Sequence, residues 1–152
     1  MNNPLQILKK STPFNTLPED VLSELADLLG EVAYAKEAVI YHQDITEMDG
    51  VDIIVKGEYE TFFYDSALNK RSVEILKEGK LYGGVSVLLN NKRSIKTVIA
   101  KKGTVAYVLP RKDFVELCQT FESFFHYYTA EFGKYMLDDE FAHFVKKPTA
   151  FD

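Results

Sequence analysis

Residues 79–94 read GKLYGGVSVLLNNKRS and interrupt a long series of short β-rich segments. The adjacent Gly83 and Gly84 lack side chains, so their backbone N–H groups can come close to a bound ligand. Residues 85–89 fit a single helical turn, and N–H donors at the start of a helix favour an anion. Arg93, nine residues after Gly84, adds a guanidinium that can bind such an anion through two hydrogen bonds. The stretch therefore predicts a small anion cradle.

A purely structural interpretation of the same stretch stays open. A Gly-Gly pair is often only a tight turn, and the apolar residues that follow it can simply belong to the core. The stretch is not a P-loop, because it lacks the pattern G-x-x-x-x-G-K-[ST]. Under the binding interpretation, the candidate ligand-binding residues are Tyr82, Gly83, Gly84, Val85, Ser86, Arg93, Ser94 and Thr97.

Segments on both sides of this stretch have the composition of short strands. They are residues 38–41, 51–55, 60–64, 72–76, 97–100 and 105–109. Polar turns separate them, and no intervening segment is long enough for a crossover helix. About six to eight strands at this spacing indicate an antiparallel β-roll, that is, a jelly roll or double-stranded β-helix. Acidic residues such as Asp52 alternate with apolar ones, as solvent-facing strand positions do.

Helical patterns flank the β-rich region and give an α+β fold class. Residues 16–19 (TLPE) resemble a capping box with Pro in the first turn, and Gly30 is the predicted stop of this helix. We expect helices over about residues 4–30, the roll over about 31–110 and C-terminal helices over about 111–145. These parts form one domain over residues 1–145, and residues 146–152 are a tail or the start of a linker.

An aromatic stripe follows the helical period in the C-terminal region. Its members are Phe121, Phe124, Phe125, Tyr128, Phe132, Tyr135 and Met136. The whole stripe can pack on the roll, which is the common fate of such a pattern. Because seven large side chains exceed what one face of a small roll covers, we expect a division. The three phenylalanines at its start pack on the roll, and Tyr128, Phe132 and Tyr135 form a lid over a ligand or a dimer contact.

The composition excludes several classes of function. A chain of 152 residues with 46% hydrophobic residues can bury one ordinary core. The net charge of −5, with lysine pairs as the densest cationic clusters, argues against direct binding of nucleic acid. No secretory signal and no long apolar run is present, so we expect a cytoplasmic protein without membrane contact. The single Cys118 suits a reducing compartment.

No catalytic or metal-binding constellation is visible in the sequence. Enzymes on β-rolls usually gather His and carboxylate ligands around a metal, and here the histidines are His42, His126 and His143. His143 and Asp139 have i,i+4 spacing, which is typical of a solvated helix face. The motifs G-x-S-x-G, H-E-x-x-H and C-x-x-C do not occur. We therefore predict that the domain is not an enzyme and has no catalytic residue, metal or resident cofactor.

Residues 82–94 resemble the phosphate-binding cassette of the cyclic nucleotide-binding domains of bacterial regulators, kinase regulatory subunits and gated channels. The family pattern is approximately F-G-E-[LI]-[AS]-L-L, a few residues, then P-R-[AS]-A-T-V-x-A. Residues 82–89, YGGVSVLL, overlay its first half without a gap, and Arg93 with Ser94 overlays the Arg-[AS] pair. The resemblance covers most of residues 5–140. It implies a β-roll with flanking helices and a site for a cyclic nucleotide.

Four features depart from the family pattern. The family has a Glu that hydrogen-bonds the ribose hydroxyl where this chain has Gly84, and its loss should cost about 1–3 kcal/mol of binding. Three residues separate Arg93 from Thr97, where the family usually has two. Either the loop bulges by one residue or Arg93 is out of register with the phosphate. Lys92 replaces the usual Pro, and Asp44 replaces a glycine that often makes an early turn.

The resemblance leaves two functions open. In the first, the chain is a regulatory sensor domain that binds a cyclic nucleotide or a related phosphate-bearing ligand and moves its C-terminal helix in response. In the second, it is a degenerate member that binds no nucleotide and acts as a dimerisation or protein-interaction module. The layout resembles the N-terminal sensor of bacterial signalling proteins that continue into CBS and nucleotidyltransferase-like domains. We therefore expect downstream domains and a homodimer through the C-terminal helix.

Overall fold

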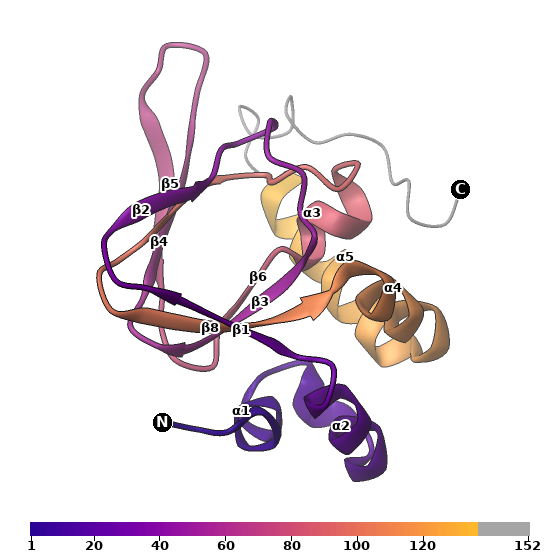
Figure 1. Ribbon diagram of the computed structural model, residues 1–152. Coiled ribbons are helices and arrows are strands. Elements are labelled where there is room, and N and C mark those ends of the chain that lie inside the picture. The colour runs from indigo at the N-terminus through magenta and orange to yellow at the C-terminus, as the bar shows by residue number, and fades with distance from the viewer. Residues whose placement is uncertain (137–152) are drawn as a thin grey trace.

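The computed structural model describes residues 1–136, in which helices lie at both ends of an eight-stranded roll (Figure 1). The terminal helices are α1 (Pro4–Lys10), α2 (Glu19–Ala26), α4 (Arg111–Thr120) and α5 (Glu122–Met136), with a 3-10 turn η1 (Phe14–Thr16) after α1. The expected helical continuation over 137–145 and the tail 146–152 lie outside the described residues.

The eight strands form two antiparallel sheets of four strands each. The first has the order β1 (Gly30–Tyr34), β8 (Thr104–Pro110), β3 (Gly50–Lys56) and β6 (Leu81–Tyr82). The second has the order β2 (Ala38–Tyr41), β7 (Thr97–Ala100), β4 (Tyr59–Tyr64) and β5 (Lys70–Leu76). Strands distant in sequence, such as β1 and β8, pair and hold the roll together. The predicted antiparallel roll and its α+β class are confirmed.

All six predicted strand segments are strands, but two further strands and both ends of the second helix were not predicted. The capping box is wrong, because Pro18 is the N-cap of α2 and the Thr16 hydroxyl donates to the Pro13 carbonyl. The helix stop is also wrong, since α2 ends at Ala26 and Gly30 begins β1. The other missed strand, β6, has only two residues, too few for a visible alternation.

The core lies between the two sheets and continues beneath the helices. Phe124 of α5 contacts Phe14 edge-to-face at a ring-centroid distance of 5.1 Å and Phe114 of α4 at 6.0 Å. Such pairs contribute about 0.5–1.5 kcal/mol each beyond the burial of their surface. Phe124 is fully buried, but these ring contacts join it to helical segments rather than to strands of the roll, and Phe121 and Phe125 are only partly buried.

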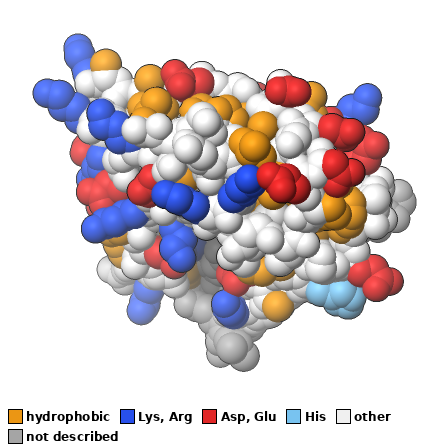
Figure 2. All heavy atoms as spheres, turned by 90° about the horizontal axis from the view of Figure 1, so that it is seen from below, with side chains coloured by type: hydrophobic (Ala, Val, Ile, Leu, Met, Phe, Trp, Pro, Cys, Tyr) orange, Lys and Arg blue, Asp and Glu red, His pale blue; other side chains and the backbone are white. Residues whose placement is uncertain are grey.

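A short helix, α3 (Gly84–Leu89), interrupts the strands between β6 and β7, as the sequence predicted. In Figure 1, α3, α4 and α5 lie together on one side of the roll, whereas the β4–β5 hairpin projects on the other side. No helix within residues 1–136 has the length and apolar character that crossing a membrane requires. Figure 2 shows cationic and anionic side chains interspersed over the face that carries α1 and α2.

Candidate functional site

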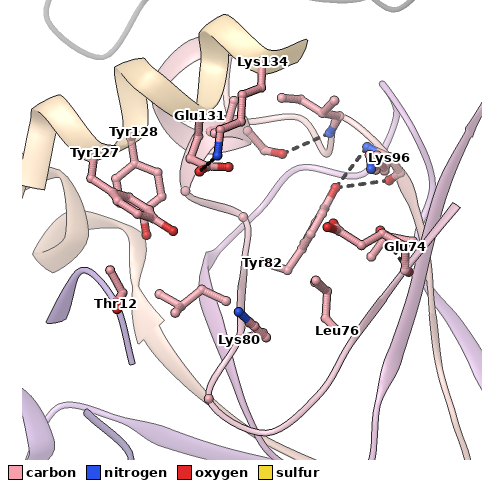
Figure 3. Close-up of a pocket in the computed structure, with 18 of the residues that line it drawn as sticks. Thr12, Glu74, Leu76, Lys80, Tyr82, Lys96, Tyr127, Tyr128, Glu131 and Lys134 are labelled. Carbon is pink, nitrogen blue, oxygen red and sulfur yellow. Dashed lines mark hydrogen bonds and ion pairs between the residues drawn. The ribbon is translucent and has the colours of Figure 1, made fainter. Parts of the chain in front are cut away.

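A cavity of about 520 Å³ lies beside α3 (Figure 3). Its walls come from β4, β5, the β6–α3 connection, the segment before β7 and one side of α5, with Lys10 and Thr12 at its N-terminal edge. Five consecutive predicted site residues, from Tyr82 to Ser86, line it. The structure therefore brings the glycine pair to the wall of a cavity large enough for a small ligand.

Gly83 is required by the backbone at the corner where β6 turns into α3. Its φ of 116° lies in a region that residues with side chains rarely adopt. A Cβ at this position would also meet Met48 Cε at 2.8 Å and the Gly50 carbonyl oxygen at 3.1 Å. Local packing alone thus accounts for Gly83, in keeping with the structural interpretation of the Gly-Gly pair.

Gly84 is covered by α5. A Cβ on Gly84 would meet the Tyr128 ring at 2.6 Å from Cζ and 2.8 Å from Cδ1, so only glycine leaves room for that ring. Tyr128 is 4% exposed and packs edge-to-face on Phe114 at 5.1 Å. Burial within its own chain favours the lid over the dimer contact for Tyr128. Phe132 also packs against the core, and the side chain of Tyr135 lies outside the described part of the chain.

Arg93 lies away from the cavity. After α3 the chain runs beside residues 44–48, where Arg93 forms an isolated antiparallel bridge with Glu47 and the Met48 N–H donates to the Lys92 carbonyl. Of the predicted site residues, Arg93, Ser94 and Thr97 are not among those that line the cavity. The cavity wall beside the glycine pair is therefore formed without Arg93.

Ser94 is fully buried, and its hydroxyl has partners within the loop. Its Oγ lies 2.7 Å from the Tyr82 hydroxyl and donates to the Lys96 carbonyl at 2.6 Å. The Lys96 N–H donates to the Tyr82 hydroxyl at 3.0 Å, and the Ile95 N–H donates to Ser86 Oγ at 3.0 Å. The additional residue is thus accommodated in a turn that hydrogen bonds to Tyr82 and Ser86 hold in place. This turn places Lys96 at the cavity wall.

Lys96 is a buried cation of the cavity. It is 4% exposed, and its ammonium donates to the Ser72 carbonyl of β5 at 3.1 Å. Burial lowers the pKa of this ammonium, and the Glu74 carboxylate opposes that shift. Lys96 was not among the predicted site residues. One feature of the sequence could have indicated it: three residues separate Arg93 from Thr97 where the family usually has two, and an additional residue here changes which side chain faces the cavity.

Exposed charged groups surround the cavity mouth. Lys80 and Lys134 lie on opposite sides of the view in Figure 3, and Lys10 lies at the N-terminal edge. The Lys134 ammonium is paired with the Glu131 carboxylate of the same helix at 2.8 Å. Cations from three separate segments therefore border the cavity, together with carboxylates such as that of Glu78.

The Tyr128 hydroxyl is buried without a hydrogen-bond partner among the described residues. Leaving a buried hydroxyl unpaired costs about 1–3 kcal/mol, so such groups are uncommon in folded proteins. Burial raises the pKa of this phenol well above its usual value. Tyr127 and Tyr128 both line the cavity, and Figure 3 shows their rings beside each other below α5.

A second polar cluster lies inside the roll, next to Tyr82. Asp52 accepts hydrogen bonds from Tyr41 and Tyr59, each at 2.7 Å, and its other carboxylate oxygen has no partner within residues 1–136. Asp52 is 1% exposed, so the solvent-facing position predicted for it is wrong. Burial raises the pKa of its carboxyl to about 6, although both hydroxyls act to lower it. Tyr41 stacks on Tyr82 at 5.9 Å, so this cluster touches the cassette.

The described residues contain no group of three side chains that could hold a metal ion. His42 and His126 are exposed on separate elements, and His143 lies outside the described residues. Cys118 is buried on α4, and burial raises the pKa of its thiol to about 12, which suits a core side chain rather than a nucleophile.

The roll and its cassette match a known family model. The model is that of the cyclic nucleotide-binding domain, and it covers residues 31–121. The chain belongs to this family. The resemblance inferred from residues 82–94 is thereby confirmed. No curated protein matches the chain.

Several solved structures share the fold at low sequence identity. The sensor domain of the transcriptional regulator DNR from Pseudomonas aeruginosa is 15% identical, with a TM-score of 0.70 and 85% of each chain covered. The Thermus thermophilus catabolite activator protein is 21% identical, with a TM-score of 0.61, and the match covers 84% of this chain and 50% of that one. The regulatory domain of Toxoplasma gondii PKA with cAMP is 23% identical, with a TM-score of 0.63, and the match covers 74% of this chain and 42% of that one. The chain thus spans about half or less of the last two structures.

Proposed function

We propose that this domain is a regulatory sensor that binds a phosphate-bearing ligand, a cyclic nucleotide or a relative of one, and responds through α5. The observation that carries this proposal is the contact between Gly84 and Tyr128. Because α5 lines the cavity and covers Gly84, a ligand beside the glycine pair has to contact or displace α5. Occupancy of the cavity and the position of the helix are then coupled.

The size and lining of the cavity suit this class of ligand. Its volume of about 520 Å³ is within the range of about 300–1,000 Å³ that is usual for small-molecule sites. Leu76, Val85 and Ile95 supply apolar surface for a base, and Lys96 and Lys80 supply cations for a phosphate.

A second function is favoured by Gly84 itself. This position has no carboxylate for a ribose hydroxyl, and the Tyr128 ring occupies the adjacent space. Arg93, which the resemblance assigned to the phosphate, is not among the residues that line the cavity. In this alternative the domain is a degenerate member that binds no nucleotide and serves as a dimerisation or protein-interaction module.

The wider context is part of the same proposal. We infer a regulatory rather than catalytic role in the bacterial cytoplasm, as the N-terminal sensor of a longer signalling chain with CBS and nucleotidyltransferase-like domains. A homodimer through the C-terminal helix would give α5 a partner to act on. The resemblance of the layout to such proteins supports this context.

A thermal-shift titration tests the function. The probes are cAMP, cGMP, cyclic dinucleotides, AMP and phosphate. A probe at 100 times its Kd should stabilise the domain by about 2.7 kcal/mol, a rise in Tm of about 5–10 °C. Lys80→Met should require more ligand for the same shift, and Lys77→Met is the matched control, because Lys77 is exposed and is not among the lining residues. No shift with any probe at millimolar concentration would support the second function.

A further inference from the structure

We propose that Lys96, and not Arg93, holds the anionic group of the ligand, and that binding there releases the edge strand β5 from the cavity wall. This inference rests on the proposed function and names the binding side chain and the second element that responds. It assigns the anion to the residue that lines the cavity rather than to the one that aligns with the family pattern.

The position of Lys96 is fixed by its own backbone. Its N–H donates to the Tyr82 hydroxyl, and its carbonyl accepts from Ser94 Oγ at 2.6 Å. Tyr82 and Ser94 are both buried, so these bonds are shielded from water. The side chain therefore starts from a rigid turn and reaches the cavity wall beside Tyr82, as Figure 3 shows.

A phosphate oxygen is a stronger partner for Lys96 than the acceptor it now has on β5. That acceptor is the neutral carbonyl of Ser72, at 3.1 Å. A hydrogen bond between an ammonium and an anionic oxygen is about twice as strong as one to a neutral acceptor. Glu74, on the same strand, acts electrostatically on Lys96 but is itself exposed to solvent. A ligand anion in the cavity can therefore compete with Ser72 for the ammonium.

Ser72 is held in an unusual conformation at this contact. Its φ of 50° is uncommon for a residue with a side chain, and the register of β4 against β5 shifts between Thr61 and Phe63, opposite this part of β5. In the second sheet, β5 is an edge strand that pairs with β4. Loss of the Lys96 hydrogen bond would remove one restraint on this conformation, so we expect the amides of β5 to exchange faster.

Isothermal titration calorimetry with cAMP and with sodium phosphate tests the assignment. Wild type is compared with Lys96→Met, Lys96→Gln and the matched control Arg93→Met. The two Lys96 variants should bind roughly tenfold to a hundredfold more weakly, whereas Arg93→Met should remain within about threefold of wild type. Gln keeps a donor for Ser72 and removes the charge, so it gives a second test if the Met variant folds poorly.

Three results would overturn the inference in distinguishable ways. If the wild type binds neither cAMP nor phosphate, both the assignment to Lys96 and the proposed function are wrong. Binding that survives in both Lys96 variants, or that Arg93→Met abolishes, would overturn the assignment and leave the proposed function standing. Hydrogen exchange over residues 70–76 tests the release, and exchange that cAMP leaves unchanged in a wild type that binds it would refute this part.

Discussion

Replacing Gly84 with alanine tests whether α5 packs directly on the cassette. The new Cβ would meet Tyr128 at 2.6 Å from Cζ, closer than real Cβ contacts, so the ring would have to move. The same ring packs on Phe114 at 5.1 Å and on Phe124 at 5.9 Å. A shift of Tyr128 would therefore disturb the aromatic cluster that joins α4 and α5 to the core.

The magnitude follows from two opposing effects. Gly→Ala in a helix ordinarily stabilises a protein by about 0.4–1 kcal/mol, because it restricts the unfolded chain. Overpacking of a filled site costs about 1–3 kcal/mol. Gly84→Ala should therefore lower the free energy of unfolding by about 1–2 kcal/mol, or Tm by about 3–8 °C. Gly133→Ala is the matched control on α5, because within residues 1–136 its added Cβ would meet no atom within 4 Å outside its own stretch of helix, and it should stabilise.

Urea unfolding of a double-mutant cycle measures the effect. In a Tyr128→Ala background the clash is gone, so Gly84→Ala should be neutral or stabilising, with a coupling energy of about 1–3 kcal/mol. An equal cost of Gly84→Ala in both backgrounds would refute the reasoning. So would a Gly84→Ala protein as stable as the Gly133→Ala control.

Three other predictions concern buried polar groups. Because the pKa of Asp52 is raised to about 6, its native carboxyl holds the proton more tightly than the unfolded chain does, and its contribution to stability falls as pH rises from about 4 to 6. Urea unfolding should show a loss of up to about 3 kcal/mol that Asp52→Asn lacks, and parallel pH profiles would contradict this. Tyr82→Phe removes the hydrogen bond of the Lys96 N–H and one of the partners of the Ser94 hydroxyl, so it should cost about 1–3 kcal/mol in the same assay, whereas Tyr107→Phe, which removes one bond to the Asn2 carbonyl, should cost less than about 1 kcal/mol. With the pKa of its thiol raised to about 12, Cys118 should resist alkylation at pH 8 in the native protein and react after unfolding, and rapid native labelling followed by mass spectrometry would contradict its burial.

Six of the eight described strands were predictable because each is a β-rich run bounded by polar turns. Asp52 shows the limit of that reasoning. Residues 50–55 are all buried, because β3 lies inside its sheet between β8 and β6 and is also contacted by α3 and α4. Alternation then no longer distinguishes an inner face from a solvent face. A carboxylate on such a strand is buried whichever face it occupies.

The candidate site was only partly predictable. The glycine pair could be placed, since a tight corner and a close approach both need residues without side chains. The position of Arg93 could not be predicted, because it depends on how the turn after α3 accommodates one additional residue while it is hydrogen-bonded to Tyr82 and Ser86. The contact between Gly84 and Tyr128 joins segments far apart in sequence, and no local sequence pattern predicts such a contact.

The central claim is that a ligand beside the glycine pair is sensed by α5. Hydrogen exchange of the whole chain, with and without millimolar cAMP, tests it most directly. The account predicts slower exchange over residues 82–89 together with a change over α5, residues 122–136. Protection confined to another part of the chain, or no change in either segment while cAMP binds, would contradict it.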